Sequence, residues 1–399
     1  MRIPQPLSAP TISESLLLGS GIALLVVVPF SNALIEIATA LLMLGALGAL
    51  WLKRLTIPRP FLQLIALWMI ACLASVVMSS DPALSWRTLL RKTSQYATLG
   101  VIASYLGQDA RTANRLLTAL VWAGILIGLD ALLQEMWGHD LLRFRATHGG
   151  RLTGPLNSPN SLASYLLVVM PLQLWAMLHG VNRWAMGGLL LGLGLETFVL
   201  VQTDAVASWL TLLIVLVVLA VLSKRASFLS CLVVVGAIGL WRWEGPSMLA
   251  RLLQLDPGRV EGWRIAWRMF LDHPIVGIGL GTYMANYMAY VPSLEGTWPR
   301  PQYAHNCYLQ LLGEGGVLGF GAFLLMIGWV FAVSLKRLNR SQAARHSFLP
   351  GLLAALTAFL VNIAFDTGLY SLPLATLFWF LLGLTAGQVG SEAKSLAHR

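Results

Sequence analysis

Long apolar runs alternate with short polar segments along most of the chain. Most runs are about 17–25 residues long, which is the length of an α-helix that crosses the hydrocarbon core of a bilayer. The strands of an outer-membrane barrel would instead alternate apolar and polar residues over about ten positions. The pattern therefore predicts about twelve membrane-spanning helices, at 14–30, 33–52, 61–79, 90–107, 113–137, 161–179, 184–202, 206–222, 226–241, 306–335, 347–365 and 369–389.

Two polar segments are too long to be simple turns between these spans. They cover residues 138–160 and 242–305. Within the second segment, Trp263, Trp267 and Phe270 recur at helical spacing. This spacing predicts an amphipathic helix at the membrane interface, with its aromatic stripe toward apolar material.

Composition excludes a soluble protein. Hydrophobic residues make up 57% of the chain and charged residues 11%, against about 25% charged in an ordinary soluble domain. Only helices or closed barrels satisfy the backbone inside lipid. We therefore predict a single all-α, polytopic integral membrane domain over residues 1–399, in which the first apolar run is a retained helix.

The basic residues indicate how the helices are oriented. With both termini in the cytoplasm, 15 of the 27 Lys and Arg fall on that side, mostly in short loops, as the positive-inside rule requires. The other 12 fall outside, and Lys92 is the single lysine among them. Both long polar segments then lie on the outer face, where their arginines favour either lipid headgroups or an anionic substrate.

The first outer segment contains Arg143, Arg145 and Arg151, followed by a turn rich in Gly, Pro and Asn. Asn160 or Ser161 is a natural cap for the next helix. A helix N-terminus beside arginines favours anion binding. The alternative is that these polar residues only cap the helix.

The second outer segment ends in two further patterns. Gly277, Gly279 and Gly281 are not a nucleotide loop, because no strand precedes them, and we predict that they serve tight backbone packing. His305 follows, where the chain re-enters the membrane. It could cap a helix, or it could accept a proton near pH 7 as a general base.

Together these segments resemble the O-antigen ligase and polymerase family of bacterial envelope membrane proteins. The family pattern is an Arg-x-x-Gly…Pro-Asn loop, an Arg-x-x-x-Trp helix leading to Pro-x-x-Gly-x-Gly, and a His-Asn followed by Glu-x-Gly. In this chain the pattern is carried by Arg151–Gly154 with Pro159 and Asn160, Arg259 with Trp263, Pro274–Gly279, and His305, Asn306 and Glu314–Gly316.

The resemblance implies a GT-C-like, inverting, metal-independent glycosyltransferase without a cofactor. It would act at the periplasmic face of the bacterial inner membrane, moving O-antigen from undecaprenyl diphosphate to the lipid A core. His305 takes the place of the catalytic histidine, and Arg259 and Arg151 take those of arginines that engage the diphosphate. Arg143, Arg145 and Arg264 are further candidates for diphosphate binding.

One position departs from the family. Members often carry Ser-Arg-Gly near the start of the eighth span, and Val206 stands where that arginine would be.

Other functions remain open at this point. An O-antigen polymerase would use the same donor, and a protein O-glycosylating ligase is a further option. A flippase or transporter would line a path with charged residues inside the spans, whereas Asp130, Glu135, Glu196 and Asp366 lie near span ends. The expected partners are the carrier-linked donor, the lipid A core acceptor and membrane lipids, with no nucleic acid. The three cysteines form no disulfide or metal-binding spacing.

Overall fold

The computed structural model describes residues 12–52, 57–179, 182–223, 257–291 and 302–397. Within these ranges every regular element is helical, and extended pairing is limited to two isolated bridges in the 138–158 loop. The helices are α1 (Ile12–Val27), α2 (Asn32–Trp51), α3 (Arg59–Val77), α4 (Pro82–Thr88), a π-helical turn (Leu89–Thr93), α5 (Ser94–Leu106), α6 (Ala110–Trp137), α7 (Pro159–Leu178), α8 (Arg183–Gln202), α9 (Val206–Ser223), α12 (Pro257–Asp272), α13 (Tyr283–Tyr290), α14 (Cys307–Arg340), α15 (Gln342–His346), α16 (Leu349–Asn362), a 3₁₀ turn (Gly368–Tyr370) and α17 (Leu372–Ala397).

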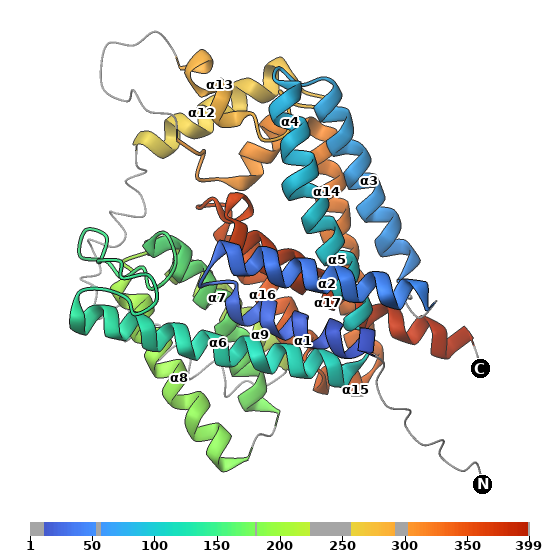
Figure 1. The fold of residues 1–399 in the computed structure, drawn as a ribbon, viewed down its shortest axis with the longest axis vertical. Helices are drawn as coiled ribbons and strands as arrows, with labels where there is room; N and C mark the ends of the chain where they lie inside the picture. Colours follow the sequence, from blue (N-terminus) through green and yellow to red (C-terminus); the bar gives the residue numbers. More distant parts are fainter. Residues whose placement is uncertain (1–11, 53–56, 180–181, 224–256, 292–301, 398–399) are drawn as a thin grey trace.

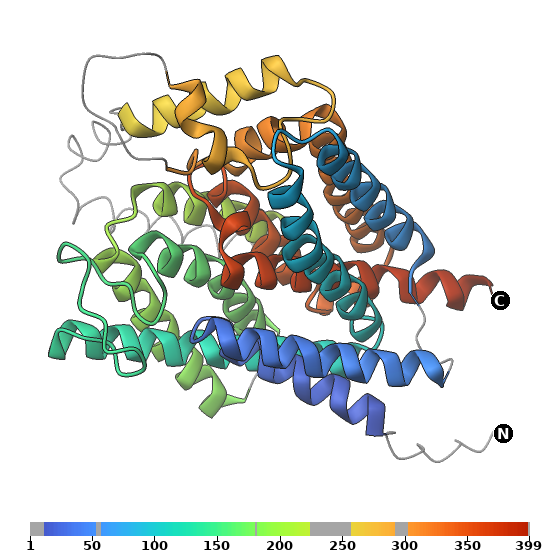
Figure 2. The same cartoon turned by 45° about the horizontal axis from the view of Figure 1, so that its top comes forward.

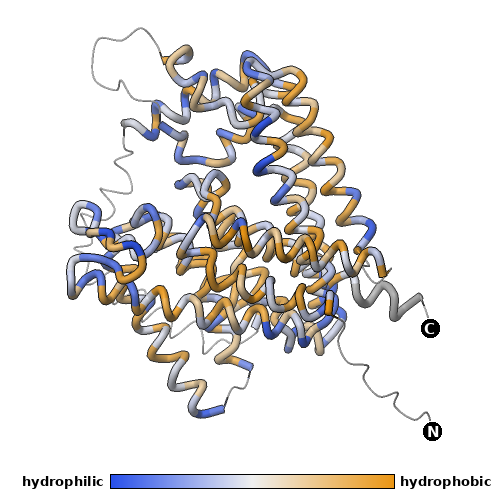
Figure 3. Tube along the Cα trace, viewed as in Figure 1, coloured by the Kyte–Doolittle hydropathy of each residue, from blue (hydrophilic) through white to orange (hydrophobic). Residues whose placement is uncertain are grey.

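Seven of the described helices are long and apolar enough to cross a membrane, and three shorter helices are also apolar. Hydrophobic residues run along these helices, while hydrophilic ones gather in the outer loops (Figure 3). The prediction of a polytopic helical membrane protein is thus confirmed. The predicted span at 226–241 lies outside the described residues, and the total of twelve spans stays a prediction.

Close helix packing depends on small residues, as is usual in membranes. Helix α5 packs along α17, and a Cβ atom on Gly383 would come within 2.2 Å of the carbonyl oxygen of Gly100. Helix α16 packs against both α7 and α9 (Figures 1 and 2). These contacts fix the C-terminal end of α16. The turn that follows this helix carries the central residue of the site described below.

Helices α12 and α13 lie at the top of the view in Figure 1 and the 138–158 loop lies at its left, both away from the end of α17 at the right. Helix α12 covers the predicted amphipathic segment. It buries Ile265, Ala266 and Met269, whereas Trp267 is 46% exposed. Trp263 and Phe270 are half-buried, so Trp267 is the exposed member of the predicted aromatic stripe, and its placement at the membrane interface stays a prediction. Residues 242–256 and 292–301 of the second outer segment lie outside the described residues.

Helix α14 is broken at Gly316, and the 274–281 segment packs into the break. Gly316 has φ 59° and ψ −163°, and the backbone N–H of Val317 donates to the carbonyl of Pro274. A Cβ on Gly277 would come within 2.2 Å of the backbone of Glu314. The prediction that this glycine pattern serves tight backbone packing is therefore confirmed.

Candidate active site

The turn that follows α16 is the centre of the candidate site, and Asp366 is its hub. Asp366 Oδ1 lies 3.8 Å from Nδ1 of His305. Asp366 Oδ2 lies 3.5 Å from the hydroxyl of Ser164, which also donates to Asn362 Oδ1 at 2.6 Å. Three segments distant in sequence therefore meet at one buried carboxylate.

His305 is held where two segments join. Its neighbour Asn306 caps α14 by accepting from the backbone N–H groups of Tyr308 and Leu309, so His305 is not the helix cap. Next in the chain, the backbone N–H of Cys307 donates to Ile363 and its thiol donates to the Asp366 carbonyl. These bonds fix the His305 backbone to the turn that carries Asp366.

The backbone of His305 adopts an uncommon conformation. Its φ is +49°, in the left-handed region, which costs a non-glycine residue about 1–2 kcal/mol. Such strain persists where surrounding structure enforces it, and it clusters at functional sites. The His305 side chain is 32% exposed, against 11% for Asp366, so the imidazole can reach a substrate while its carboxylate partner stays buried.

Arg259 reaches the same turn from the first part of α12. Its guanidinium donates to the carbonyl of Phe365 at 3.1 Å. Phe365 directly precedes Asp366, so the Arg259 side chain ends beside the hub. One N–H of the guanidinium makes this bond. Its other N–H groups make no hydrogen bond to a described residue.

Arg151 lies in the first outer segment, in the loop between α6 and α7. Its Nε donates to the Thr203 carbonyl at 2.7 Å and its Nη2 to Asn160 Oδ1 at 3.1 Å. Burial lowers the pKa of Arg151, and the positive charge of Arg259 acts in the same direction, while Asp204 opposes both. The two guanidinium groups thus repel each other weakly, and an anion between them would relieve that repulsion.

The structure brings Arg151, Arg259 and His305 together around one chain of contacts. Asn160, which accepts from Arg151, stands one helical turn before Ser164 and bonds to it through its own carbonyl. Ser164 leads to Asp366 and so to His305 and Arg259.

The other predicted arginines lie outside this chain of contacts. Arg143 donates to the Phe30 carbonyl, and both it and Arg145 donate to Asn157. Burial, followed by the charge of Arg145, lowers the pKa of Arg143. Arg264 is exposed and pairs with Glu261 at 3.6 Å. Their predicted role in diphosphate binding stays a prediction.

Val206, at the position of the missing family arginine, is the first residue of α9. It lies two residues after Asp204, whose carbonyl accepts from Arg151 at 3.4 Å. The departure from the family therefore falls beside the anchoring point of an arginine that is present.

The structure corrects the predicted helix cap and adds Asp366 to the site. The helix cap is Ser158, which accepts from the Ser161 N–H, so the prediction of Asn160 or Ser161 as cap was wrong, and Asn160 instead accepts from Arg151. In the sequence, Asp366 is only an acidic residue near a span end. Its proximity to His305 depends on a contact between distant segments, and the only local signal is an acid closing an apolar run.

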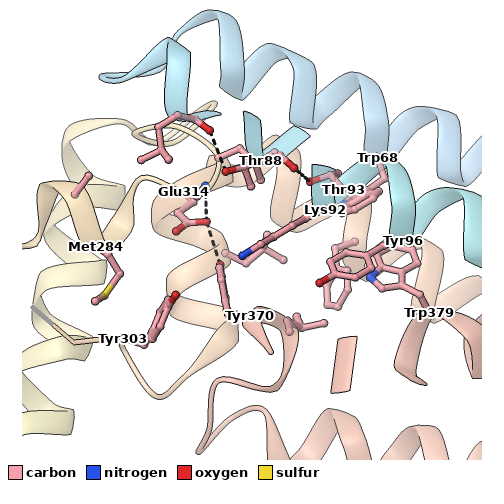
Figure 4. Close-up of a pocket in the computed structure, with 17 residues that line it drawn as sticks. Trp68, Thr88, Lys92, Thr93, Tyr96, Met284, Tyr303, Glu314, Tyr370 and Trp379 are labelled. Atoms are coloured by element: carbon pink, nitrogen blue, oxygen red, sulfur yellow. Dashed lines mark hydrogen bonds between the residues drawn. The ribbon is translucent and has the colours of Figure 1, made fainter. Parts of the chain in front are cut away.

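A cavity of about 560 Å³ adjoins the site. Tyr303 and Tyr370 line it, with ring centroids 5.7 Å apart, two residues before His305 and four after Asp366. Figure 4 shows Lys92 extending into this space, with Glu314 and Tyr370 facing it. Arg151, Arg259 and His305 are not among its lining residues, so the cavity is a separate space next to the segments that carry the site.

Glu314 organises the wall of this cavity. Its carboxylate accepts from the backbone N–H groups of Gly281 and Tyr283, from the Gln310 amide and from the Tyr370 hydroxyl. Four donors satisfy a buried carboxylate at this position. Glu314 therefore ties the glycine segment to α14 and to the turn after α16.

Among the described residues, no three His, Cys, Asp or Glu side chains gather as a metal-binding group. The polar groups at the site are guanidinium, imidazole, carboxylate and hydroxyl. These groups can bind an anion and transfer a proton.

The fold is that of a polytopic helical membrane protein, and its candidate site joins two arginines, a histidine and a buried carboxylate. Residues 160–324 match the model of the family described as O-antigen ligase. This part of the chain is an O-antigen ligase family domain, and the protein is a glycosyl-transferring enzyme. The domain occurs in ligases and in polymerases and implies lipid-linked O-antigen substrates. No curated protein matches the chain.

Proposed function

We propose that the protein is an O-antigen ligase that transfers glycan from undecaprenyl diphosphate to the lipid A core at the periplasmic face of the bacterial inner membrane. The observation that carries this proposal is the meeting of Arg151, Arg259 and His305 around Asp366, within and beside the family domain. We infer twelve spans, including the apolar run at 226–241, and a GT-C-like arrangement.

The donor side of the reaction needs a group that stabilises a leaving diphosphate. Negative charge grows on the phosphate oxygen as the bond from the sugar C1 breaks. Arg259 and Arg151 offer planar guanidinium forks that match phosphate oxygens. Each fixed electrostatic contact of this kind is worth about 10²–10³ in rate. We predict that they serve this role without a divalent metal.

The acceptor side needs a base. As the acceptor oxygen forms its bond to the sugar C1, its proton passes to His305, and undecaprenyl diphosphate leaves from the opposite face. A single displacement of this kind inverts the configuration at C1. Asp366 orients the imidazole and stabilises the imidazolium that forms. The 3.8 Å separation is longer than a hydrogen bond, and such contacts often tighten only when substrate binds.

An O-antigen polymerase is the alternative within the family, since it would use the same donor and the same residues. The two differ in the acceptor, which is a second carrier-linked chain for the polymerase. A flippase is the alternative from another class, and it would form no new glycosidic bond.

The test is transfer by the purified protein, given carrier-linked glycan together with lipid A core. Glycan attached to lipid A core is expected of a ligase. Elongated glycan on the carrier would identify a polymerase, and unchanged substrates would remove the enzymatic proposal. His305→Ala should abolish the product while the protein stays folded in detergent.

A further inference from the structure

The cavity beside His305 has the character of a lipid site. Trp68, Tyr96, Phe323 and Trp379 line its inner part, between α3, α5, α14 and α17. Met284 and Tyr303 line the opposite side of the space from Trp68 and Trp379 (Figure 4). Cavities of several hundred Å³ with apolar walls and a few polar groups are typical ligand sites.

Lys92 places a positive charge at this cavity. It is the single lysine that the predicted topology puts on the outer face. Within the described part of the chain, no hydrogen bond or ion pair joins its ammonium to another residue. Glu314, which also lines the cavity, is already bonded to four donors. A charge at an apolar cavity without a partner favours an anionic ligand.

The local backbone sets this lysine into the cavity wall. Residues Leu89–Thr93 form a π-helical turn between α4 and α5. Such turns are rare and occur often at functional sites. Thr88, Lys92, Thr93 and Tyr96 all line the cavity. Arg91 and Lys92 are both exposed, but Arg91 is not among the lining residues.

The position of the cavity indicates which substrate it would hold. Its lining includes neither Arg151 nor Arg259, which are proposed to hold the donor diphosphate. Tyr303 and Tyr370 place it next to the segments that carry His305 and Asp366. A space beside the proposed base but apart from the proposed donor arginines is the one left for the acceptor.

We propose that this cavity holds the acceptor lipid and that Lys92 binds a phosphate group of that lipid. The inference rests on the proposed function. The acceptor class it defines is a phosphorylated glycolipid whose apolar part enters between α3, α5, α14 and α17. A lysine that only reached general headgroups at the membrane surface would act like Arg91 and would not distinguish acceptors.

The experiment compares Lys92→Gln with Lys92→Arg, and uses Arg91→Gln as the matched control on the same turn. Each purified variant is given carrier-linked glycan and lipid A core, either phosphorylated or enzymatically dephosphorylated. A charge-assisted hydrogen bond contributes about 1.5–3 kcal/mol, which corresponds to about 10–100-fold in binding. Lys92→Gln should raise the KM for the phosphorylated acceptor by about tenfold or more and leave the KM for the donor unchanged.

Two further results are expected. Wild-type protein and Arg91→Gln should prefer the phosphorylated acceptor, Lys92→Gln should lose that preference, and Lys92→Arg should retain most of it. A cavity-filling variant, Ala285→Trp, should raise the acceptor KM, whereas Ala289→Trp one turn along α13 and outside the cavity lining should not.

The outcomes separate the inference from the function. If wild-type protein transfers glycan but Lys92→Gln keeps the acceptor KM and the phosphate preference, the inference is overturned. A rise in the donor KM alone would reassign the cavity to the donor and also overturn it. If wild-type protein forms no glycosidic product with either acceptor, the proposed function itself fails. Thermal unfolding in detergent shows that each variant is folded.

Discussion

The Nδ1 atom of His305 lies 3.8 Å from Oδ1 of Asp366, across two segments that enter the site from different helices. The imidazole is partly exposed, while the carboxylate is buried and contacts Ser164. A buried carboxylate beside a histidine orients the ring. This pairing gives the proposed base a defined direction toward the acceptor.

The first prediction concerns Asp366→Asn. The amide keeps the shape but removes the charge that stabilises imidazolium, so we expect kcat to fall by about 10²-fold or more, within the range of general-base catalysis. Asp272→Asn, at the end of α12, serves as the control. Unchanged kcat in Asp366→Asn would remove Asp366 from the mechanism.

The second prediction concerns Arg259. Arg259→Ala should lower kcat/KM for the donor by about 10²–10³-fold, because it removes a fixed charge at the leaving group. Arg259→Lys should recover only part of that loss, since an ammonium lacks the planar fork. Arg268 lies on the same helix, and its hydrogen bond among the described residues goes to the Tyr290 carbonyl. Arg268→Ala should therefore change donor kinetics little. Full activity of the lysine variant would show that charge alone suffices.

The third prediction concerns stability. A Cβ on Gly316 would approach the carbonyl carbon of Ile275 to 2.4 Å, and its φ of +59° disfavours any side chain. Gly316→Ala should therefore destabilise the packing of the 274–281 segment on α14 and lower the unfolding temperature in detergent. Gly319→Ala has open space around its Cβ and should unfold like the wild-type protein. Equal unfolding temperatures for the two variants would contradict the packing described for this break.

The fourth prediction concerns metal. If arginines supply the charge that a divalent cation would otherwise supply, EDTA should leave the transfer rate unchanged. Loss of activity in EDTA that magnesium restores would overturn the metal-free mechanism. The assay needs a chelator-treated acceptor, because phosphorylated glycolipids carry divalent cations into the reaction.

The sequence predicted most spans well because hydrophobic runs of membrane length have few alternative structures. The run at 113–137, for example, corresponds to α6 from Ala110 to Trp137. Motif order also predicted Arg151, Arg259 and His305 as site residues, and their roles stay a prediction. Their arrangement around one carboxylate could not be read from the motifs, because it depends on how α7, α12 and α16 pack.

Two features of the site, the pairing of Asp366 and the cap at Ser158, differ from what was predicted, each for a physical reason. Asp366 is an ordinary acid at a span end until α14 brings His305 beside it. The helix cap was misplaced although a local signal existed. Proline favours the first position of a helix, so Pro159 indicates Ser158 as the cap, which leaves Asn160 to accept from Arg151.

We propose that Arg151, Arg259 and His305 form one centre for glycosyl transfer. A single-turnover assay tests this proposal. Purified wild-type protein, Arg151→Ala, Arg259→Ala and His305→Ala are mixed in excess with carrier-linked glycan and lipid A core, and glycan on lipid A is followed over time. The account predicts rapid product with wild-type protein and a rate reduced at least about 10²-fold in every variant. Product formed at the wild-type rate by folded His305→Ala protein would contradict it.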